Sequence, residues 1–476
     1  MYLTLSGPDV DAPTAALSLN LLWIVIGAAL VVFMQAGFAM VETGFCRAKH
    51  AVHVVSTNFM IFGLGFVGFF FTGYAFMFGG FSYPGYFGFD TAIGSPLISV
   101  GNWVFLWKGP FALSGLGGPA TTASIGAFFL YMVAFMDTTA TIPTGAMAER
   151  WKWKSFVAWG LFCGALYYPL FGAWTWGGGW LNQLGNNIGL GFGYVDFAGS
   201  GVVHATGGVA GLAGALVLGP RLGKFADDGT PRALLGHNVP MAMFGTFILL
   251  FGWFGFNAAS TFAATDVQFA TVAVNTALAA AFGSVAALVW ITRRGGKPDP
   301  SMMVNGMLAG LVAITAPCAF VQPWAAAVIG VIAGVVVIEA VWFVERRLKI
   351  DDPVGAIAVH GVCGILGVLC VGLFADGSYG AGWNLTTGSA TDGRGVTGLF
   401  YDVGLGVRQL GAQSIGALTI CTVMFGIAYA FFRIQDRVTE GGIRPSEDDE
   451  MNGLDLAEMG VVAYDDAPVS EPLTLG

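Results

Sequence analysis

Long apolar segments recur along the chain and are separated by short polar connections. A run of about 20 apolar residues can cross a ~30 Å hydrocarbon core as an α-helix. The pattern predicts an all-α polytopic membrane protein with eleven transmembrane helices. Their expected positions are 18–42, 54–79, 120–146, 155–174, 200–218, 238–262, 270–292, 302–321, 324–344, 354–374 and 409–432. The connections 81–118 and 375–408 are longer, polar or glycine-rich, and we expect loops there.

Composition agrees with this reading and excludes several protein classes. Hydrophobic residues make up 55% of the chain and charged residues 10%, whereas soluble proteins carry about 25% charge. A soluble enzyme and a nucleic-acid-binding protein are therefore excluded, and disorder is excluded for most of the chain. Glycine accounts for 72 of 476 residues, which suits helices packed closely in a bilayer. Residues 1–17 lack Lys and Arg, so we expect a short polar lead and not a signal peptide.

Enzyme chemistry has no support in the sequence. The six cysteines form no C-x-x-C pair, so we expect buried side chains and neither a zinc site nor a disulfide framework. The glycine-rich run at 185–193 lacks the Gly-Lys-Ser/Thr of a phosphate-binding loop, which leaves ATP-driven pumping unsupported. We expect no cofactor and no metal.

Basic residues predict the orientation of the helices. Seventeen of the 20 Lys and Arg residues lie in alternate connections and in the C-terminal segment, and only Lys108, Arg394 and Arg408 lie on the opposite side. Because cytoplasmic loops carry the excess of Lys and Arg, we expect the N-terminus outside and the C-terminus in the cytoplasm. Residues 440–476 hold ten acidic residues and one basic residue. We therefore divide the chain into a membrane domain, 1–438, and an acidic tail, 439–476. We expect the tail to be a soluble cytoplasmic extension, and one interpretation of it is a disordered solubilising segment.

Two segments repeat the spacing D-x7-H-x3-G-x2-G, and each opens a predicted helix. They comprise Asp196, His204, Gly208 and Gly211, and then Asp352, His360, Gly364 and Gly367. The segments lie in the fifth and tenth helices, so repeats of five helices (18–218 and 238–374) enter the membrane with opposite orientation, and helix 409–432 is extra. This is the inverted-repeat plan of many transporters, whose functional site lies near midplane.

The repeated histidines are the strongest functional candidates. His204 and His360 each lie about seven residues into their helix, from opposite faces, so both approach the middle of the membrane. Two neighbouring imidazoles can share one N–H, which makes them a proton-relay element. We expect the four glycines to let the two helices approach closely. Asp196 either binds a cation or caps its helix, and we favour the cap for Asp196 and Asp352.

Other ionisable residues in or near the spans receive less specific predictions. Glu42 and Glu339 lie close to basic clusters, and we expect interfacial ion pairs. We expect solvated side chains at three histidines near the cytoplasmic boundary, His50, His53 and His237. Asp137 either faces the bundle and bonds to Thr138 or Thr139, or raises the affinity for a cation.

Taken together, several motifs resemble the ammonium transporter (Amt) family, and the similarity covers nearly the whole chain. They are TGAMAER at 144–150, WGGG at 176–179, DFAGSGVVH at 196–204, GWFGFNAAS at 252–260 and DDPVGAIAVHGVCG at 351–364. The resemblance implies that ammonium is recruited outside and deprotonated, that ammonia crosses an apolar pore, and that the proton follows through a histidine pair, so that uptake is electrogenic.

The resemblance also assigns residues to these steps. It places Phe135, Trp176 and Ser260 in the outer vestibule, where aromatic faces attract a small cation. Phe135 and Phe256 match a stacked phenylalanine gate. The remaining positions are the pore histidines His204 and His360, the pore-wall residues Trp253 and Thr315, and the supporting Asp196. Trp176 favours the Amt branch over Rhesus-type channels, which typically lack an aromatic residue there.

In the tail, Gly453-Leu454-Asp455 and residues 460–464 also resemble the family. The family forms homotrimers in the cytoplasmic membrane, and many bacterial relatives bind a trimeric PII signalling protein. Two departures are Gly355, where many relatives carry an acid, and Met459, where a histidine is usual.

The alternatives to a transporter are an ammonium sensor and an intramembrane enzyme. We expect no kinase or cyclase domain beyond residue 476, and no nucleophile or metal constellation appears in the sequence, so we expect a transporter.

Overall fold

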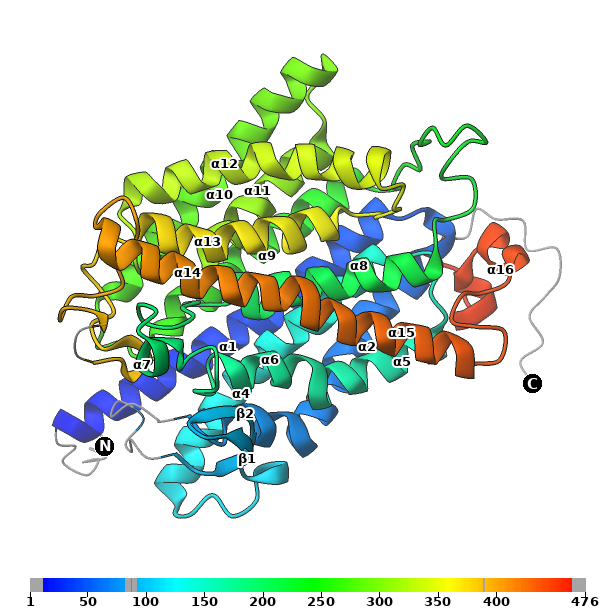
Figure 1. The fold of residues 1–476 in the computed structure, drawn as a ribbon. Coiled ribbons are helices and arrows are strands. Elements are labelled where there is room, and N and C mark those ends of the chain that lie inside the picture. Colours follow the sequence, from blue (N-terminus) through cyan, green and yellow to red (C-terminus); the bar gives the residue numbers. More distant parts are fainter. Residues whose placement is uncertain (1–11, 82–86, 88–91, 388–389, 465–476) are drawn as a thin grey trace, which may run out of the picture.

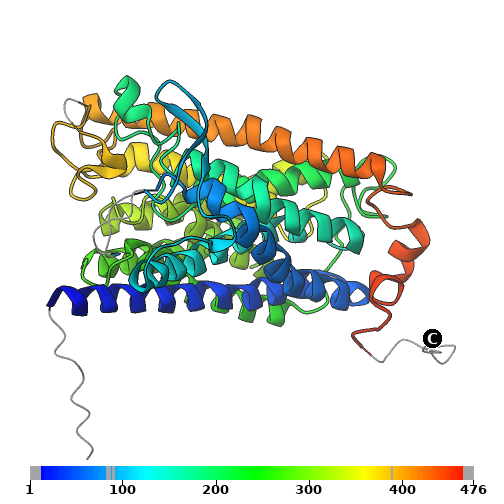
Figure 2. The ribbon, with the colours of Figure 1, turned by 90° about the horizontal axis from the view of Figure 1, so that it is seen from below.

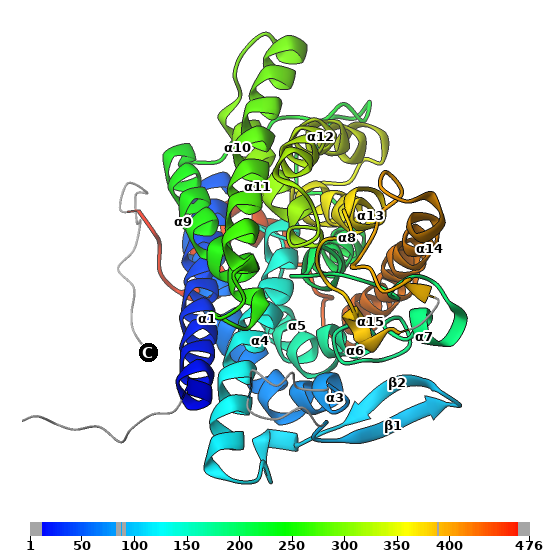
Figure 3. The same cartoon turned by 90° about the vertical axis from the view of Figure 1, so that its left-hand side faces the viewer.

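The computed structural model describes residues 12–81, 87, 92–387 and 390–464. Part of the expected polar lead (1–11) and the last part of the acidic tail (465–476) lie outside the described residues. The described chain forms a bundle of long helices that share one long axis (Figure 1), and Figure 3 views many of them nearly end on. The helix α1 runs the length of the bundle at one edge (Figure 2). The tail helix α16 lies at the opposite end of the bundle from the start of α1.

The first half of the chain supplies five of the expected spans. Here η denotes a 3₁₀ or π-helical segment that interrupts or extends an α-helix. The helical elements are α1 (Ala12–Phe45), η1 (Ala48–His50), α2 (Ala51–Gly68), η2 (Phe69–Gly73), α3 (Tyr74–Phe78), η4 (Phe111–Leu113), α4 (Pro119–Ala146), α5 (Trp153–Phe162), η5 (Cys163–Tyr167), α6 (Tyr168–Trp174), α7 (Leu184–Ile188), η6 (Ser200–Ala205) and α8 (Thr206–Leu218).

The second half supplies six spans and the beginning of the tail. Its elements are α9 (Val239–Asn257), η7 (Ala258–Thr261), α10 (Gln268–Gly295), α11 (Pro300–Thr315), α12 (Pro323–Trp342), η8 (Phe343–Arg347), η9 (Ile357–Val362), α13 (Cys363–Phe374), η10 (Trp383–Leu385), α14 (Val403–Thr419), η12 (Ile420–Met424), α15 (Phe425–Val438), α16 (Glu447–Asn452) and η13 (Asp455–Met459).

The helices confirm the predicted all-α, polytopic architecture. Ten helical stretches of the described residues are long and apolar enough to cross a membrane, and the eleventh, α11, is a shorter apolar helix. The sequence predicted that α11 extends to residue 321, but it ends at Thr315. Pro317 follows two residues later and has no N–H with which to continue the helix.

One expected loop contains regular structure. Residues 81–118 include an antiparallel pair, β1 (Ser95–Val100) and β2 (Trp103–Lys108). The hairpin projects from the bundle beside α3 (Figure 3). Aromatic and apolar residues favour a strand at β2, and three of them are buried: Val104, Leu106 and Trp107. The sequence predicted a loop without a further membrane crossing, and it did not predict this hairpin. Two strands of six residues can pair without an apolar run long enough to cross a membrane.

The two repeated segments pack against each other reciprocally. The π-helical turn η6 contacts α13, and the π-helical turn η9 contacts α8. A Cβ on Gly208 would lie 2.2 Å from the backbone nitrogen of Gly361, and one on Gly364 would lie 2.5 Å from the carbonyl oxygen of Ser200. These two glycines therefore permit the close approach of the fifth and tenth helices. Gly211 instead faces Ala146 of α4, so the prediction that it contributes to this approach was wrong.

Candidate functional site

A carboxylate fixes the start of each histidine-bearing segment. Asp196 accepts hydrogen bonds from the backbone N–H groups of Gly199 (2.8 Å), Gly201 (2.8 Å) and Val202 (2.9 Å). Asp352 accepts from three N–H groups in the same way, with its shortest bond, 2.7 Å, from Ile357. A carboxylate at a helix N-terminus satisfies donors that have no partner within the helix. The sequence left two roles open for Asp196, cation binding and helix capping, and this geometry is that of a helix cap.

The capped segments begin with a π-helical turn, and each turn carries one histidine. His204 is in η6 and His360 is in η9, and both are buried. Their Nδ1 atoms lie 3.2 Å apart, and the two rings are stacked at 23°. One N–H shared between two ring nitrogens satisfies this contact, as predicted for a pair of neighbouring imidazoles.

Aromatic rings continue from the histidine pair toward one end of the bundle. The Phe256 ring centroid is 5.4 Å from that of His204, and Phe135 stacks on Phe256 at 4.0 Å and 18°. On the other side of the pair, the ring of Phe38 is 6.1 Å from that of His360. The rings of Phe135, Phe256, His204, His360 and Phe38 thus form one continuous column through the bundle.

A cavity of about 340 Å³ opens beyond Phe135, at the end of the column away from Phe38. Its lining includes the three residues that the resemblance assigned to a vestibule: Phe135, Trp176 and Ser260. The Trp176 ring lies 5.9 Å from that of Phe135, edge to face, and its Nε1–H donates to the carbonyl oxygen of Asp196 at 2.7 Å. This bond fixes the indole beside the Phe135 ring, with both rings available to a cation in the cavity.

Ser260 presents an acceptor to this cavity. Its hydroxyl donates to the carbonyl oxygen of Phe256 at 2.7 Å, and its Oγ lies 3.1 Å from the hydroxyl of Tyr131. Since the hydroxyl proton is already engaged by a carbonyl group, a free lone pair on Oγ can accept an N–H from a ligand. The arrangement suits a hydrogen-bond donor that carries positive charge.

Two further residues, which the resemblance assigned to a pore wall, lie beside His204. The Nε1–H of Trp253 donates to the Thr315 hydroxyl at 2.8 Å, and the Trp253 ring lies 5.0 Å from that of His204, at 19°. The Thr315 hydroxyl in turn donates to the carbonyl oxygen of Leu311. Thr315 therefore holds the indole that stacks on the first histidine.

The cavity is also lined by residues that sequence reasoning missed. Asp266 and Tyr379 line the cavity, and the Tyr379 hydroxyl donates to the Asp266 carboxylate at 2.6 Å. Trp383 lines it as well and packs on Phe197, with ring centroids 5.9 Å apart. Tyr379 and Trp383 lie in the long connection 375–408, whose sequence has no periodic pattern that would indicate which side chains turn inward.

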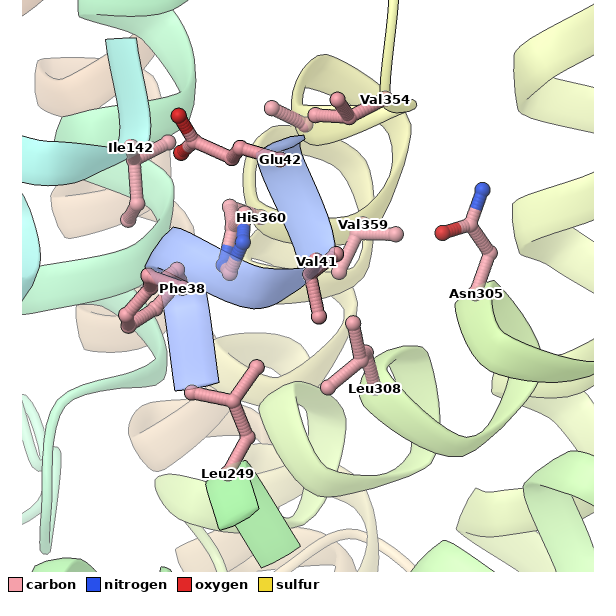
Figure 4. Close-up of a pocket in the computed structure, with 11 residues that line it drawn as sticks. Phe38, Val41, Glu42, Ile142, Leu249, Asn305, Leu308, Val354, Val359 and His360 are labelled. Carbon is pink, nitrogen blue, oxygen red and sulfur yellow. The ribbon is translucent and has the colours of Figure 1, made fainter. Parts of the chain in front are cut away.

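A small pocket of about 20 Å³ lies next to His360, at the Phe38 end of the column (Figure 4). Glu42 is among its lining residues and is buried. The Glu42 carboxylate accepts hydrogen bonds from Asn58 (2.7 Å) and Thr144 (2.9 Å) and forms no ion pair among the described residues. The prediction of an interfacial ion pair was wrong for Glu42, because its side chain turns into the bundle. For Glu339 it was correct, with Arg294 at 3.3 Å.

A buried charge cluster occupies the end of the bundle that carries the basic connections. Glu149 pairs with Arg47 (2.5 Å) and Arg221 (3.1 Å), and Arg221 also pairs with Asp351 (2.8 Å). Burial opposes the ionisation of both acids. Arg221 and Arg47 nevertheless hold the pKa of Glu149 below its usual range, and Arg150 and Arg221 hold that of Asp351 well below its own.

The tail is bound to this same end of the bundle. Asp455 accepts from the backbone N–H groups of Val52 (3.0 Å) and His53 (2.8 Å), at the start of α2. The N–H of Leu454 donates to Nδ1 of His50 at 3.2 Å. His50 and His53 are therefore buried, contrary to the prediction that they are solvated. The described part of the tail is a docked segment, since Tyr464 also reaches Nε2 of His237 at 2.8 Å.

Two remaining positions are clarified by the geometry. Asp137 is buried, and its Oδ1 has no hydrogen-bond partner among the described residues. Thr138 and Thr139 instead donate to backbone carbonyl groups of their own helix, so neither bonds to Asp137 as proposed from the sequence.

Gly355 has a φ of +82°, and a Cβ there would lie 2.6 Å from Nδ2 of Asn305. A side chain at 355 is therefore disfavoured in this backbone conformation.

Comparisons with known proteins agree on one family. The model of the Ammonium Transporter Family matches residues 22–464. Ammonium transporter Amt2 of Archaeoglobus fulgidus is 44% identical over 464 residues, with 96% of this chain and 91% of the relative covered. Ammonium transporter Amt1 of Haloferax mediterranei is 35% identical over 471 residues, with 96% and 81% covered.

Solved structures of similar fold include a protein described as Sensor Amt Protein. It has a TM-score of 0.79 and 36% identity, with 93% of this chain and 99% of that chain covered. Mep2 of Candida albicans has a TM-score of 0.75 and 30% identity, with 96% and 93% covered.

Proposed function

This chain belongs to the ammonium transporter family and is a multi-pass membrane transporter of ammonium, and from that premise we propose how its residues carry out transport. Ammonium enters the cavity lined by Phe135, Trp176 and Ser260. The aromatic faces attract the cation, an effect worth about 0.5–2 kcal/mol, and the Ser260 hydroxyl accepts one of its N–H groups. Both interactions fit a compact cation that donates hydrogen bonds.

The single observation that carries the mechanism is the histidine pair. Below the stacked rings of Phe135 and Phe256, the Nδ1 atoms of His204 and His360 lie 3.2 Å apart. Carrying a cation through such an apolar column would cost several kcal/mol in lost hydration. We propose that ammonium loses its proton near Phe135, that ammonia crosses, and that the proton moves through the pair. Transport is then electrogenic, and potassium, which cannot deprotonate, is excluded.

The orientation, location and assembly are part of the same proposal. The basic connections and the acidic tail occur at one end of the bundle, which we assign to the cytoplasm, with the N-terminus outside. We assign the chain to the cytoplasmic membrane, with residues 1–438 as the transport domain and 439–476 as a regulatory tail. The resemblance supports a homotrimer with a pore in each subunit and control by a PII protein. Native mass measurement in detergent tests the trimer, and co-purification with a PII protein tests that partner.

The functional test uses the purified chain in liposomes on a solid-supported membrane. Ammonium pulses should give a transient current and an ammonia flux above that of empty liposomes. If neither appears, the transport mechanism proposed here fails.

A signalling role is the second candidate, and one observation favours it. The fold is similar to that of a protein described as Sensor Amt Protein, and the tail of this chain is docked on the transport domain through Asp455. A sensor would bind ammonium and change tail exposure without passing ammonia. Hydrogen exchange of residues 446–464 with and without ammonium, measured alongside flux, separates the two functions.

A further inference from the structure

The small pocket beside His360 is the strongest unassigned feature of the pore. It lies at the Phe38 end of the aromatic column (Figure 4). Three polar side chains line it, those of Glu42, His360 and Asn305, and its other lining residues are apolar. Glu42 contributes an acid to the pocket next to the second histidine, and the transport steps described above do not use it.

The size of the pocket decides what can occupy it. Its volume is about 20 Å³, and a site needs roughly 10–15 Å³ on this measure to hold one water. One small molecule such as water or ammonia therefore fits, and a hydrated cation does not. Glu42 and His360 both line the pocket, so one such molecule can lie next to both residues. Because His360 uses Nδ1 for His204, Nε2 is the nitrogen left for this exchange.

A buried network holds the Glu42 carboxylate in place. Asn58 donates to Oε2 at 2.7 Å, and the Thr144 hydroxyl lies 3.0 Å from Oε1 and 2.9 Å from Oε2. Asn58 is held in turn by Gln35 and Thr141, at 3.3 and 3.1 Å from its Oδ1. A carboxylate has about four lone-pair sites, so these donors leave acceptor capacity on Glu42.

The protons of this network permit two states of Glu42. The Thr144 hydroxyl has one proton but lies within bonding distance of both Glu42 oxygens and of the carbonyl oxygen of Thr141, at 2.5 Å. When Glu42 is ionised, Thr144 donates to it. When Glu42 is protonated, Thr144 donates to Thr141 and its own oxygen accepts from Glu42. The same heavy-atom positions therefore suit a side chain that gains and loses a proton.

Other charged groups do not take this role in the pocket. The neighbouring acid, Asp352, directs its carboxylate to three backbone N–H groups at the start of η9. No Lys or Arg side chain is among the described lining residues, and Asn305 does not titrate. Among the described lining residues of this pocket, Glu42 and His360 are thus the groups that can exchange a proton, and His204 lies behind His360.

We propose that Glu42 is the inner proton acceptor of the pore, which takes the proton from the histidine pair and returns it to ammonia. The proposal rests on the transport function proposed above. Protonated His360 breaks an N–H bond, the molecule in the pocket passes one proton on, and an O–H bond forms on Glu42. This step converts an imidazolium and a carboxylate into two neutral groups. Glu42 then gives the proton to ammonia at the exit, which regenerates the carboxylate and releases ammonium.

The test compares Glu42→Gln with wild type for charge moved per ammonia transported. Current on a solid-supported membrane gives the charge, and a chemical assay of the total ammonium accumulated inside the liposomes gives the ammonia transported. We expect the ratio to fall at least about tenfold, because Gln keeps the size and hydrogen-bonding capacity of Glu but cannot carry the proton. The matched control is Glu339→Gln, an acid of α12 paired with Arg294 away from the pocket, which should keep the wild-type ratio.

The outcomes separate the two proposals. A wild-type ratio in Glu42→Gln overturns the role of Glu42, whereas the absence of wild-type current overturns electrogenic transport itself. If Glu42→Gln does not assemble, difference infrared spectroscopy of wild type and Glu42→Asp carries the test. Ammonium should then change a carboxylic-acid band whose position differs between the two proteins. An identical band, or none, overturns the proposal.

Discussion

His204 and His360 are separated by 156 positions in the sequence, yet their Nδ1 atoms lie 3.2 Å apart where η6 meets η9. The contact requires two capped helices of opposite direction to cross at very short range. Gly208 and Gly364 make that crossing possible, because each faces the backbone of the partner segment. The histidine pair is therefore a property of the repeat packing as much as of the two side chains.

Alanine at Gly208 tests this dependence. Its Cβ would lie 2.2 Å from the nitrogen of Gly361, a backbone atom that cannot move without separating the two helices. We expect Gly208→Ala to lower ammonium current at least about tenfold or to prevent assembly. Gly126→Ala in α4 is the control, since nothing lies within 4 Å of its added Cβ. Equal currents in both variants would show that the close approach does not set the pore geometry.

Ser260→Ala removes the hydroxyl acceptor of the vestibule. A hydrogen bond to a charged group contributes about 1.5–3 kcal/mol, so the ammonium concentration that gives half-maximal current should rise by about tenfold or more. The maximal current should change less, because the ring column is untouched. Concentration series of the current measure both quantities, with Ser284→Ala on an exposed face of α10 as the control. An unchanged half-maximal concentration argues against ligand binding at Ser260.

Thr315→Val tests the support of the pore wall. The variant keeps the shape of the side chain but leaves the buried Nε1–H of Trp253 without its acceptor. An unsatisfied buried donor costs about 1–3 kcal/mol, so the melting temperature in detergent should fall. Thr422→Val, at an exposed position of η12, should melt like wild type. If both variants melt like wild type, Trp253 does not depend on Thr315.

The pairing of Glu149 predicts a pH dependence with a definite sign. Its pKa in the folded protein lies below the ~4.3 of an unfolded chain, so the ionised form stabilises the fold above about pH 4.3. That contribution is lost as pH falls through the folded-state pKa. The difference in melting temperature between wild type and Glu149→Gln should be constant above about pH 5 and shrink below about pH 4. A difference that does not vary between pH 3 and 7 would contradict the depressed pKa.

Much of the fold follows from the sequence. The apolar runs recur along the whole chain and the basic residues occur in alternate connections, so each pattern supports the other. The span positions and the pairing of His204 with His360 follow from that pattern and from the repeated spacing. The β-hairpin at 95–108 was missed because short strands leave a weak pattern beside membrane spans. Pro317 is a local signal for the early end of α11. The apolar run continues past this proline, so the run alone predicts a longer helix.

The site was predicted less completely, and the reasons are physical. Glu42 was assigned to an ion pair from its proximity to Arg47 and Lys49, since sequence distance does not reveal which face of α1 carries the side chain. In the structure the carboxylate turns inward to Thr144 and Asn58. Asp266 and Tyr379 meet across two connections without periodicity. The sequence predicted solvated side chains for His50 and His53. It could not show their burial, because the packing of the tail over α2 depends on tertiary contacts.

The most direct test of the central claim compares ammonium with potassium in wild type and in the double variant His204→Asp, His360→Glu. Wild type in liposomes should give current with ammonium and none with potassium, because only ammonium can leave its proton to the histidine pair. The double variant replaces the shared N–H with two acids, so it should lose the ammonium current or begin to pass potassium. Wild-type current and wild-type selectivity in the double variant would contradict the proton relay.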